Sequence, residues 1–268
     1  MIILSKLLRH WAYTYDFKAG EKYINSYPQF VTNIQGLYIH FVHITRHVKK
    51  PNVEKNHMPL LLLHGWPSSI MEFYKDIQLK FAEEREIIIP SLPGFGFSSS
   101  PTIPGFTCIE MSVVLKNLML RLGHDKFRVQ DGSYGANNGH IMSILFPQHV
   151  DDTLNIHDKQ EMPFVKYTKR FRNTFTQANQ IYTTSIYFDL NKSPNVLAEY
   201  LIEQILRADP LNVLEKKINI NTEMIDNLMM YWRTKCIYRA MQTYKAQFEK
   251  LPTDFIDLLL HTYGIIKE

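Results

Sequence analysis

The chain has 268 residues, of which 45% are hydrophobic and 21% charged, and this composition is that of an ordinary globular protein and excludes a disordered one. A chain of this length can bury one substantial core, which favours one α/β domain with an insertion over two independent domains. The formal net charge of +4 is mild and no long run of Lys or Arg is present, which excludes a nucleic-acid-binding face.

The N-terminal part of the chain begins with an interrupted apolar segment and continues into a strand pattern. Residues 1–8 have too few apolar side chains to span a bilayer, which takes about 20, and lack the layout of a secretory signal. Residues 7–15 are aromatic and mixed, which predicts a helical or meandering lead-in. Residues 38–44 alternate, with Ile39 and Phe41 on one side, and predict a half-buried strand.

Short apolar runs and helical segments alternate through the middle of the chain. The runs at 60–63 and 86–89 consist almost entirely of Leu or Ile and predict strands buried on both faces. Further strands are predicted at 127–130 and 153–157, and helices at 70–82, 111–122 and 137–146, with Gly123 as a C-terminal cap. This alternation predicts a parallel sheet covered by helices on both faces.

Residues 159–250 are largely helical and amphipathic. Pro194 stands at a favoured first-turn position of a helix, and residues 227–248 predict one or two more helices. A helical block inserted into an α/β sheet is a lid that closes over the strand ends. The predicted organisation is an N-terminal segment over 1–50, an α/β core over 51–157, a helical lid over 158–250 and a partial return to the core over 251–268.

Three motifs follow predicted strands. Residues 129–135, Val-Gln-Asp-Gly-Ser-Tyr-Gly, have the layout of a nucleophile elbow, in which a strand turns sharply into a helix with a reactive side chain at the tip. His-Gly-Trp-Pro at 64–67 and Pro-Ser-Leu-Pro-Gly-Phe-Gly-Phe-Ser at 90–98 precede it. Gly132 and Gly135 allow the tight turn. In this order, the motifs predict an α/β-hydrolase.

An α/β-hydrolase needs a nucleophile, an acid and a histidine in chain order, and two backbone N–H groups that stabilise an oxyanion. The elbow places Ser133 at the nucleophile position. The residue after it, Tyr134, and the loop near Trp66 are the candidates for the two N–H groups. His64 is expected to order the backbone of its loop and not to transfer protons.

A set of short motifs spread over the chain is shared with one enzyme family. The shared motifs are Tyr15-Asp16-Phe17, Tyr27-Pro28-Gln29-Phe30, Thr32-Asn33-Ile34, Ile39-His40-Phe41, residues 64–69 and 90–98, Phe146-Pro147-Gln148-His149-Val150, Asn191-Lys192-Ser193-Pro194, Tyr231-Trp232 with Thr234, and Tyr244-Lys245. In these motifs the chain resembles animal microsomal epoxide hydrolases and insect juvenile hormone epoxide hydrolases. The resemblance covers nearly the whole chain, with a lid shortened between about 158 and 181.

The resemblance implies an α/β-hydrolase fold, with a doubly wound, mostly parallel sheet and an inserted helical lid, and hydrolysis of lipophilic epoxides to diols. The implied partner is a lipophilic small molecule, an epoxide or a terpenoid such as juvenile hormone. No cofactor, metal or nucleic acid is expected. The resemblance implies an endoplasmic reticulum location with membrane association, whereas the chain as written reads as a cytoplasmic protein.

The elbow of this chain departs from the family pattern. In the family an aspartate attacks an epoxide carbon and forms an alkyl ester, which a histidine-activated water cleaves, while two lid tyrosines hold the epoxide oxygen. Alignment of Gln130, Gly132, Tyr134 and Gly135 with the family motif puts Ser133 at the nucleophile position. A serine that opened an epoxide would leave an ether without a carbonyl for water to attack, so the cycle would stall. An impaired hydrolase is therefore expected.

Other family positions are matched only in part. Tyr244 matches one lid tyrosine, and its alternative role is that of a core aromatic residue. The second tyrosine falls near Phe175, with Tyr182 and Tyr187 as substitutes. Asp131 is an alternative nucleophile, because it lies on the same strand face two residues before Ser133.

The C-terminal landmarks are also altered. Asp257 is the candidate acid, since it is the one carboxylate near the family position. His261 matches a different histidine and follows Asp257 too closely to act as its base. The family's catalytic histidine would lie beyond Glu268, so the last strand and helix of the fold are expected to be missing.

Three functions therefore remain open. The first is an epoxide hydrolase that keeps some activity, through Asp131 or a longer C-terminus. The second is a non-catalytic relative that binds apolar ligands in the retained pocket, and the third is a serine esterase that uses Ser133. The two cysteines, Cys108 and Cys236, are expected to be reduced, buried thiols.

Overall fold

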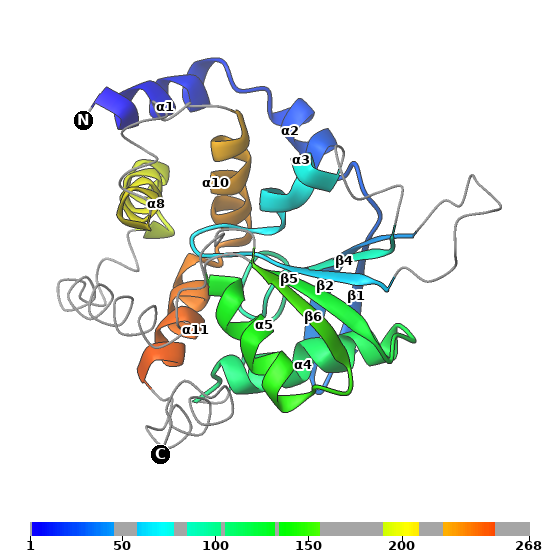
Figure 1. Cartoon of the computed structure of the whole chain (residues 1–268). Helices are drawn as coiled ribbons and strands as arrows, with labels where there is room; N and C mark the ends of the chain where they lie inside the picture. The colour runs from blue at the N-terminus through cyan, green and yellow to red at the C-terminus, as the bar shows by residue number, and fades with distance from the viewer. Residues whose placement is uncertain are drawn as a thin grey trace.

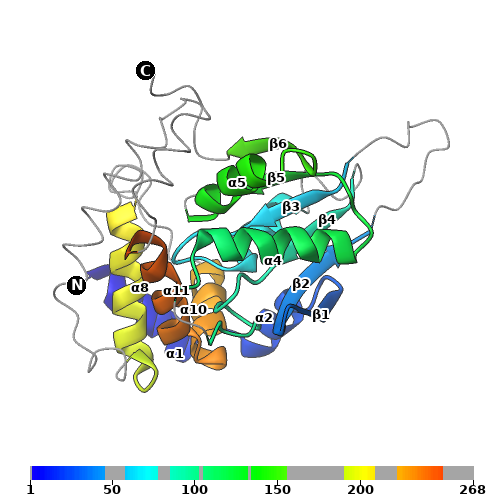
Figure 2. The same ribbon diagram turned by 90° about the horizontal axis from the view of Figure 1, so that it is seen from below.

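The six strands of the computed structural model form one mostly parallel sheet, with helices on both faces and further helices beside it (Figures 1 and 2). The structure describes residues 2–45, 58–77, 85–102, 105–131, 134–155, 190–208 and 222–249. The strands are β1 (Gln29–Ile34), β2 (Leu37–Ile44), β3 (Leu60–Leu63), β4 (Ile87–Pro90), β5 (Phe127–Asp131) and β6 (Val150–Asn155). Their order across the sheet is β1-β2-β4-β3-β5-β6.

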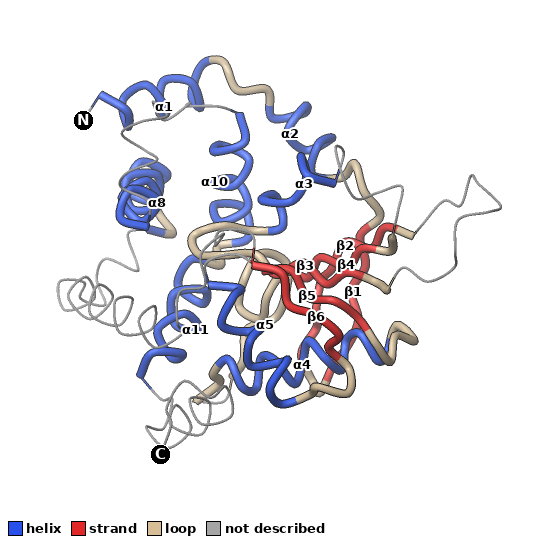
Figure 3. The backbone as a smooth tube through the Cα atoms, in the orientation of Figure 1, coloured by secondary structure: helices blue, strands red, loops and turns tan. Residues whose placement is uncertain are grey.

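The sheet contains both antiparallel and parallel strand pairs. The pairs β1·β2 and β2·β4 are antiparallel, whereas β4·β3, β3·β5 and β5·β6 are parallel. Parallel strands need crossover connections, and α4 (Cys108–Arg121), between β4 and β5, and α5 (Tyr134–Leu145), between β5 and β6, supply two of them. Figure 3 shows both helices together on one side of the sheet. The predicted parallel sheet is therefore confirmed.

Burial of the strands confirms one prediction and corrects another. All four residues of β3 and of β4 are buried, as the continuous Leu and Ile runs predict. The prediction that 38–44 is half-buried is wrong, because Ile39 to Val42 are all buried. β2 lies between β1 and β4, and Phe41 and Val42 belong to the apolar clusters on opposite faces of the sheet. The alternation of residue types in β2 therefore occurs in a strand whose side chains are buried on both faces of the sheet.

β1 was not predicted from the sequence. It pairs with β2 through the two-residue turn Gln35-Gly36, in which φ is +51° and +87°. Positive φ at both positions is the geometry that suits a tight hairpin, and glycine adopts it without strain. Phe30 and Val31 in this strand are exposed, so β1 has no buried apolar run to mark it.

The other helices are α1 (Ile2–Tyr13), α2 (Phe17–Ile24), the 3₁₀ turn η1 (Ile70–Phe73), α3 (Tyr74–Asp76), α8 (Pro194–Ala208), α10 (Thr222–Thr234) and α11 (Ile237–Glu249). The lead-in is thus helical, and the segment predicted as one or two helices forms two, separated at Lys235, whose φ is +53°. The helix predicted over 70–82 begins as a 3₁₀ turn, and residues 78–84 lie outside the described part. None of the helices among the described residues is long and apolar enough to cross a membrane.

The N-terminal segment is attached to the C-terminal helices by a buried polar contact. Tyr15 follows α1, and its hydroxyl donates a hydrogen bond of 2.5 Å to Asp226 Oδ1 of α10. Gly20 of α2 permits this approach, since a Cβ there would lie 2.0 Å from the Tyr15 hydroxyl. Burial, more than any nearby charge, raises the pKa of Asp226. The contact fixes α10 against the start of the chain.

Both cysteines are free and buried, in agreement with the prediction. Burial raises the pKa of Cys108 to about 12, so this thiol stays protonated at neutral pH. The predicted partial return to the core over 251–268 lies outside the described residues, so it stays a prediction.

Candidate active site

The three sequence motifs lie at the carboxyl ends of parallel strands. β3 ends at Leu63 before the first motif, β4 ends at Pro90 within the second, and β5 ends at Asp131 within the elbow motif. Asp131 pairs with Leu63 across the sheet, so the elbow strand ends beside the first motif. The helix α5 then begins at Tyr134, which is the strand-to-helix layout of an elbow. Ser133 itself lies outside the described residues.

His64 holds two of the motif loops together. Its Nδ1–H donates to the carbonyl of Gly65 at 3.1 Å, so its Nε2 is free to accept from the backbone N–H of Leu92 at 3.2 Å. The ring is fully buried, and this burial lowers its pKa to about 4. His64 is therefore neutral at pH 7. The prediction that it orders the backbone is confirmed.

One backbone N–H of the first motif already has a hydrogen-bond partner. The N–H of Gly65 donates to Glu72 Oε2 at 3.0 Å, and Glu72 lies in η1, which Ser69 caps by accepting from the N–H of Met71. The N–H of Gly65 is thus occupied. Trp66, the next residue, stays the candidate for the oxyanion N–H on this loop, as does Tyr134 on the elbow.

The structure brings together two predicted site residues, Trp66 and Tyr244. Their rings are stacked with centroids 5.1 Å apart and planes 19° apart, although one residue follows β3 and the other lies in α11. Tyr231 of α10 and Phe95 of the second motif meet the Trp66 ring edge-on. Tyr244 is 3% exposed, as expected of a core aromatic residue. Its role as a lid tyrosine stays a prediction.

The second motif requires glycine where it meets α11. Gly94 has a φ of +88°, and a Cβ there would lie 2.5 Å from Thr243 Oγ1. Thr243 is one residue before Tyr244. The close approach of this loop to α11 therefore helps to fix the position of Tyr244 relative to Trp66.

α10 is hydrogen-bonded to the first motif, which the sequence did not predict. Tyr231 donates its hydroxyl to the carbonyl of Ser68 at 2.7 Å, and Asn227 Nδ2 donates to the carbonyl of Pro67 at 2.9 Å. Both residues lie on one face of α10, four positions apart. The Tyr-Trp-x-Thr motif was recognised in the sequence, but its contact with residues far upstream was not.

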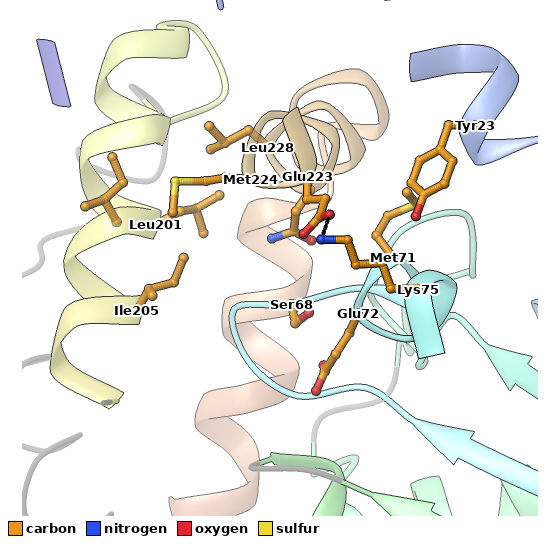
Figure 4. Close-up of a pocket in the computed structure, with 12 residues that line it drawn as sticks. Tyr23, Ser68, Met71, Glu72, Lys75, Leu201, Ile205, Glu223, Met224 and Leu228 are labelled. Carbon is orange, nitrogen blue, oxygen red and sulfur yellow. Dashed lines mark ion pairs between the residues drawn. The ribbon is translucent and has the colours of Figure 1, made fainter. Parts of the chain in front are cut away.

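A cavity of about 240 Å³ adjoins the contact between α10 and the first motif (Figure 4). Its apolar wall comes from α8 and α10, with Leu201, Ile205, Met224 and Leu228 facing one another, and its polar wall contains Glu72. The ion pair between Lys75 and Glu223 closes one side. Ser68 lines the cavity, which connects it to the first motif. An apolar chamber with a few polar groups at one end suits an amphiphilic small molecule.

A larger cavity of about 790 Å³ lies between the first two helices and α10. Trp11, Phe17, Met229 and Trp232 are among its apolar lining residues, and Phe97 of the second motif also lines it. This cavity touches the N-terminal segment and not the first motif. It is therefore the less direct candidate for a reacting ligand.

Several predicted residues lie where the structure gives no side-chain description. These are Asp131 and Tyr134, whose backbones alone are described, and Ser133, Asp257, Phe175, Tyr182, Tyr187 and His261, which lie outside the described residues. Their roles stay predictions. Asp131 has a described backbone partner on each side, because it pairs with Leu63 and with Asn155.

Comparison with known proteins adds two family matches. Residues 2–73 match the family "Epoxide hydrolase N terminus", and residues 58–179 match "alpha/beta hydrolase fold". Among curated proteins, the "Juvenile hormone epoxide hydrolase" of Bombyx mori is 35% identical over 91% of this chain and 61% of its own length. The "Epoxide hydrolase 1" of Oryctolagus cuniculus is 32% identical over 90% of this chain and 63% of its own.

Solved structures agree with these matches. The crystal structure of juvenile hormone epoxide hydrolase from the silkworm Bombyx mori aligns with a TM-score of 0.71 at 34% identity, covering 94% of this chain and 66% of that one. The Aspergillus niger epoxide hydrolase aligns with a TM-score of 0.70 at 26% identity, covering 90% and 66%. The chain spans about three fifths of the length of the curated relatives.

Proposed function

Since the chain belongs to the epoxide hydrolases of the α/β-hydrolase fold, we propose that it binds lipophilic epoxides and that its hydrolytic cycle is impaired at Ser133. The ligand class is proposed from the relatives, four of which are juvenile hormone epoxide hydrolases by name. A terpenoid epoxide is accordingly the first ligand to test. The two parts of the proposal, binding and impairment, rest on different residues.

The stacking of Tyr244 on Trp66 carries the binding part of the proposal. In the family a lid tyrosine holds the epoxide oxygen, and Tyr244 occupies the matching position. The centroid of its ring lies 5.1 Å from that of Trp66, at the edge of the sheet where β5 ends. A phenol at this edge could donate a hydrogen bond to the oxygen that is released when an epoxide opens.

The apolar chamber beside the first motif supports a lipophilic ligand. Leu201, Ile205 and Met224 offer aliphatic and thioether surface, while Ser68 and Glu72 sit at the polar end. Burial of apolar area contributes about 25 cal/mol per Å², so an isoprenoid chain would gain much of its affinity here. In the proposed orientation, the isoprenoid part of the ligand lies between α8 and α10, and its epoxide points toward the motif loops.

Serine at the elbow supports the impairment part. Attack of Ser133 Oγ on an epoxide carbon would break the carbon–oxygen bond of the ring, pass the serine proton to the released oxygen and leave an alkyl ether. An ether has no carbonyl for water to attack, whereas the ester of an aspartate has one. Asp131 does not substitute in this proposal, because its backbone is paired on both sides within β5, before the turn.

The test compares the wild-type protein with Ser133→Asp. Each is incubated with a terpenoid epoxide, and intact mass and diol formation are followed. For wild type we expect saturable binding and no repeated turnover. For Ser133→Asp we expect a mass increase equal to the epoxide, released by hydroxylamine as an ester would be. Tyr244→Phe in the Ser133→Asp background should slow adduct formation while the protein stays folded.

Two results would contradict the proposal. Multiple turnovers by wild type would refute the impairment, and absence of saturable binding to wild type would refute the ligand class. Labelling of Ser133 by a fluorophosphonate, with hydrolysis of a short ester, would instead favour a serine esterase. Loss of that label in Ser133→Ala would verify the site of the reaction.

A further inference from the structure

Two histidines and a glutamate from distant parts of the chain meet at the sheet edge opposite the motif loops. Glu86 directly precedes β4 and His124 lies between α4 and β5, so both lie at the amino ends of parallel strands. His43 lies near the carboxyl end of β2, which runs antiparallel to β4, and its backbone pairs with Ile88. The three therefore share one edge.

Their ligand atoms converge. His43 Nε2 lies 2.5 Å from Glu86 Oε1, and His124 Nε2 lies 3.2 Å from the same oxygen. The ligand atoms of the three residues all fall within 4.8 Å of one another. Each side chain keeps some exposure, between 16% and 29%, which leaves a path for an ion from solvent. Among the described residues this group is the one that could hold a metal.

We propose that His43, Glu86 and His124 form a binding site for a divalent transition metal ion of the zinc class. Bonds of about 2.0–2.1 Å at tetrahedral angles require ligand atoms roughly 3.3 Å apart. His124 Nε2 already lies near that distance from Glu86 Oε1, and His43 Nε2 needs to move outward by less than about 1 Å. Water would complete the fourth position.

The ligand set defines the metal class. Two imidazole nitrogens and one carboxylate suit Zn²⁺, Co²⁺ and Ni²⁺, whereas Mg²⁺ and Ca²⁺ prefer all-oxygen sites. No metal is expected from the sequence, in which His43 lies 43 positions from Glu86 and Glu86 lies 38 positions from His124. The pairing of β2 with β4 brings them together.

The backbones that carry the ligands are fixed. The carbonyl of Glu86 accepts from the N–H of Leu60 at 2.8 Å, and the N–H of His43 donates to the carbonyl of Pro28 at 3.0 Å. The N–H of His124 donates to the carbonyl of Met119 at 3.0 Å. A bound ion would therefore connect β2, β4 and the end of α4 and stabilise the fold. At the edge opposite the elbow, it would take no part in the epoxide reaction.

The test uses the full chain after EDTA treatment. ZnCl₂ is titrated by calorimetry at pH 7.5, CoCl₂ by visible absorption, and MgCl₂ serves as the negative control. We expect one Zn²⁺ per chain, a tetrahedral Co²⁺ spectrum, no Mg²⁺ binding and a Tm that rises with Zn²⁺ concentration. The readouts are independent of epoxide turnover, so they stand or fall separately from the proposed function.

Variants assign the site. His124→Asn and Glu86→Gln should each weaken Zn²⁺ binding at least about tenfold and remove the tetrahedral Co²⁺ spectrum. His10→Asn, on α1 and outside the cluster, is the matched control and should bind as wild type does. His124→Asn keeps the His43–Glu86 contact, so it decides the question if Glu86→Gln does not fold. Absence of 1:1 binding, or equal affinity in wild type and His124→Asn, would overturn the proposal.

Discussion

Two buried histidines, His40 and His64, are neutral in the folded protein. His40 is hydrogen-bonded to Ser91 Oγ and to Gln29 Oε1, each at 2.9 Å. Burial lowers the pKa of each histidine to about 4. An unfolded histidine titrates near 6.5, so between these values the unfolded chain binds more protons than the folded one. Their contribution to stability is complete above pH 6.5 and is lost as the pH falls toward 4.

The first prediction concerns this acid sensitivity. The free energy of unfolding should fall between pH 6 and pH 4.5 with a slope approaching about 1.4 kcal/mol per pH unit for each histidine. Urea unfolding at a series of pH values measures the slope. His40→Gln should reduce the slope by about 1.4 kcal/mol per pH unit, which corresponds to one proton. An unchanged slope in this variant would show that His40 is not neutral in the folded state.

Asp226 predicts the opposite pH dependence. Its pKa is raised, first by burial, so as the pH rises above the ordinary value of 3.8 the unfolded chain ionises before the folded one. Stability therefore declines across this range. Asp226→Asn keeps an acceptor for the Tyr15 hydroxyl without the charge and should remove the decline, leaving stability at pH 7 equal or higher. Asp226→Ala should lower it by about 1–3 kcal/mol, because the Tyr15 hydroxyl loses its partner.

At the scale of elements, α4 depends on a capping box. The N–H of Thr107 donates to Glu110 Oε2 at 2.7 Å, and Thr107 Oγ1 accepts from the N–H of Ile109 at 3.2 Å. This cap explains why α4 begins at Cys108, three residues before the predicted start. The prediction used apolar periodicity and did not use the Thr-x-x-Glu spacing of Thr107 and Glu110, which is the sequence signature of a capping box.

Thr107→Ala should lower the free energy of unfolding by about 1 kcal/mol. Thermal or urea unfolding measures it, with exposed Thr102→Ala as the matched control that should change little. Equal stability of the two variants would indicate that water replaces the cap without loss.

Elements could be predicted where burial leaves a continuous apolar signature. The Leu run of β3 and the Ile run of β4 define their strands because both faces are covered. β1 and α2 were not predicted because neither has a continuous run of buried apolar residues. Exposed Phe30 and Val31 in β1, and Gly20 of α2 packed beneath Tyr15, have no local pattern that identifies them.

The candidate site could be predicted in its motifs but not in its contacts. The order of the three motifs predicts that the elbow and the 64–69 loop lie at the same edge of the sheet, since parallel strands end at one edge. The hydrogen bonds from Asn227 and Tyr231 to the 64–69 loop join residues about 160 positions apart, and no spacing encodes them.

At the scale of the whole molecule, α10 connects the 64–69 loop to α8 and α2. Tyr231→Phe removes one hydrogen bond to the loop and should lower the free energy of unfolding by about 0.5–1.5 kcal/mol. It should also speed amide hydrogen exchange in α10. Tyr238→Phe on α11, where the side chain is exposed, is the control. The link between α10 and the loop would be refuted if both variants exchanged alike.

α10 is fastened on two sides, by Tyr15 at Asp226 and by the first motif at Asn227 and Tyr231. α8 forms the facing wall of the 240 Å³ chamber through Leu201 and the residues around it. α8 also packs against α1, and its Leu197 and Leu201 belong to the same buried apolar cluster as Leu7 of α1. A displacement of α10 would have to break the hydrogen bonds on both of its sides, so a force applied at the N-terminal segment would be transmitted to the 64–69 loop through one rigid helix.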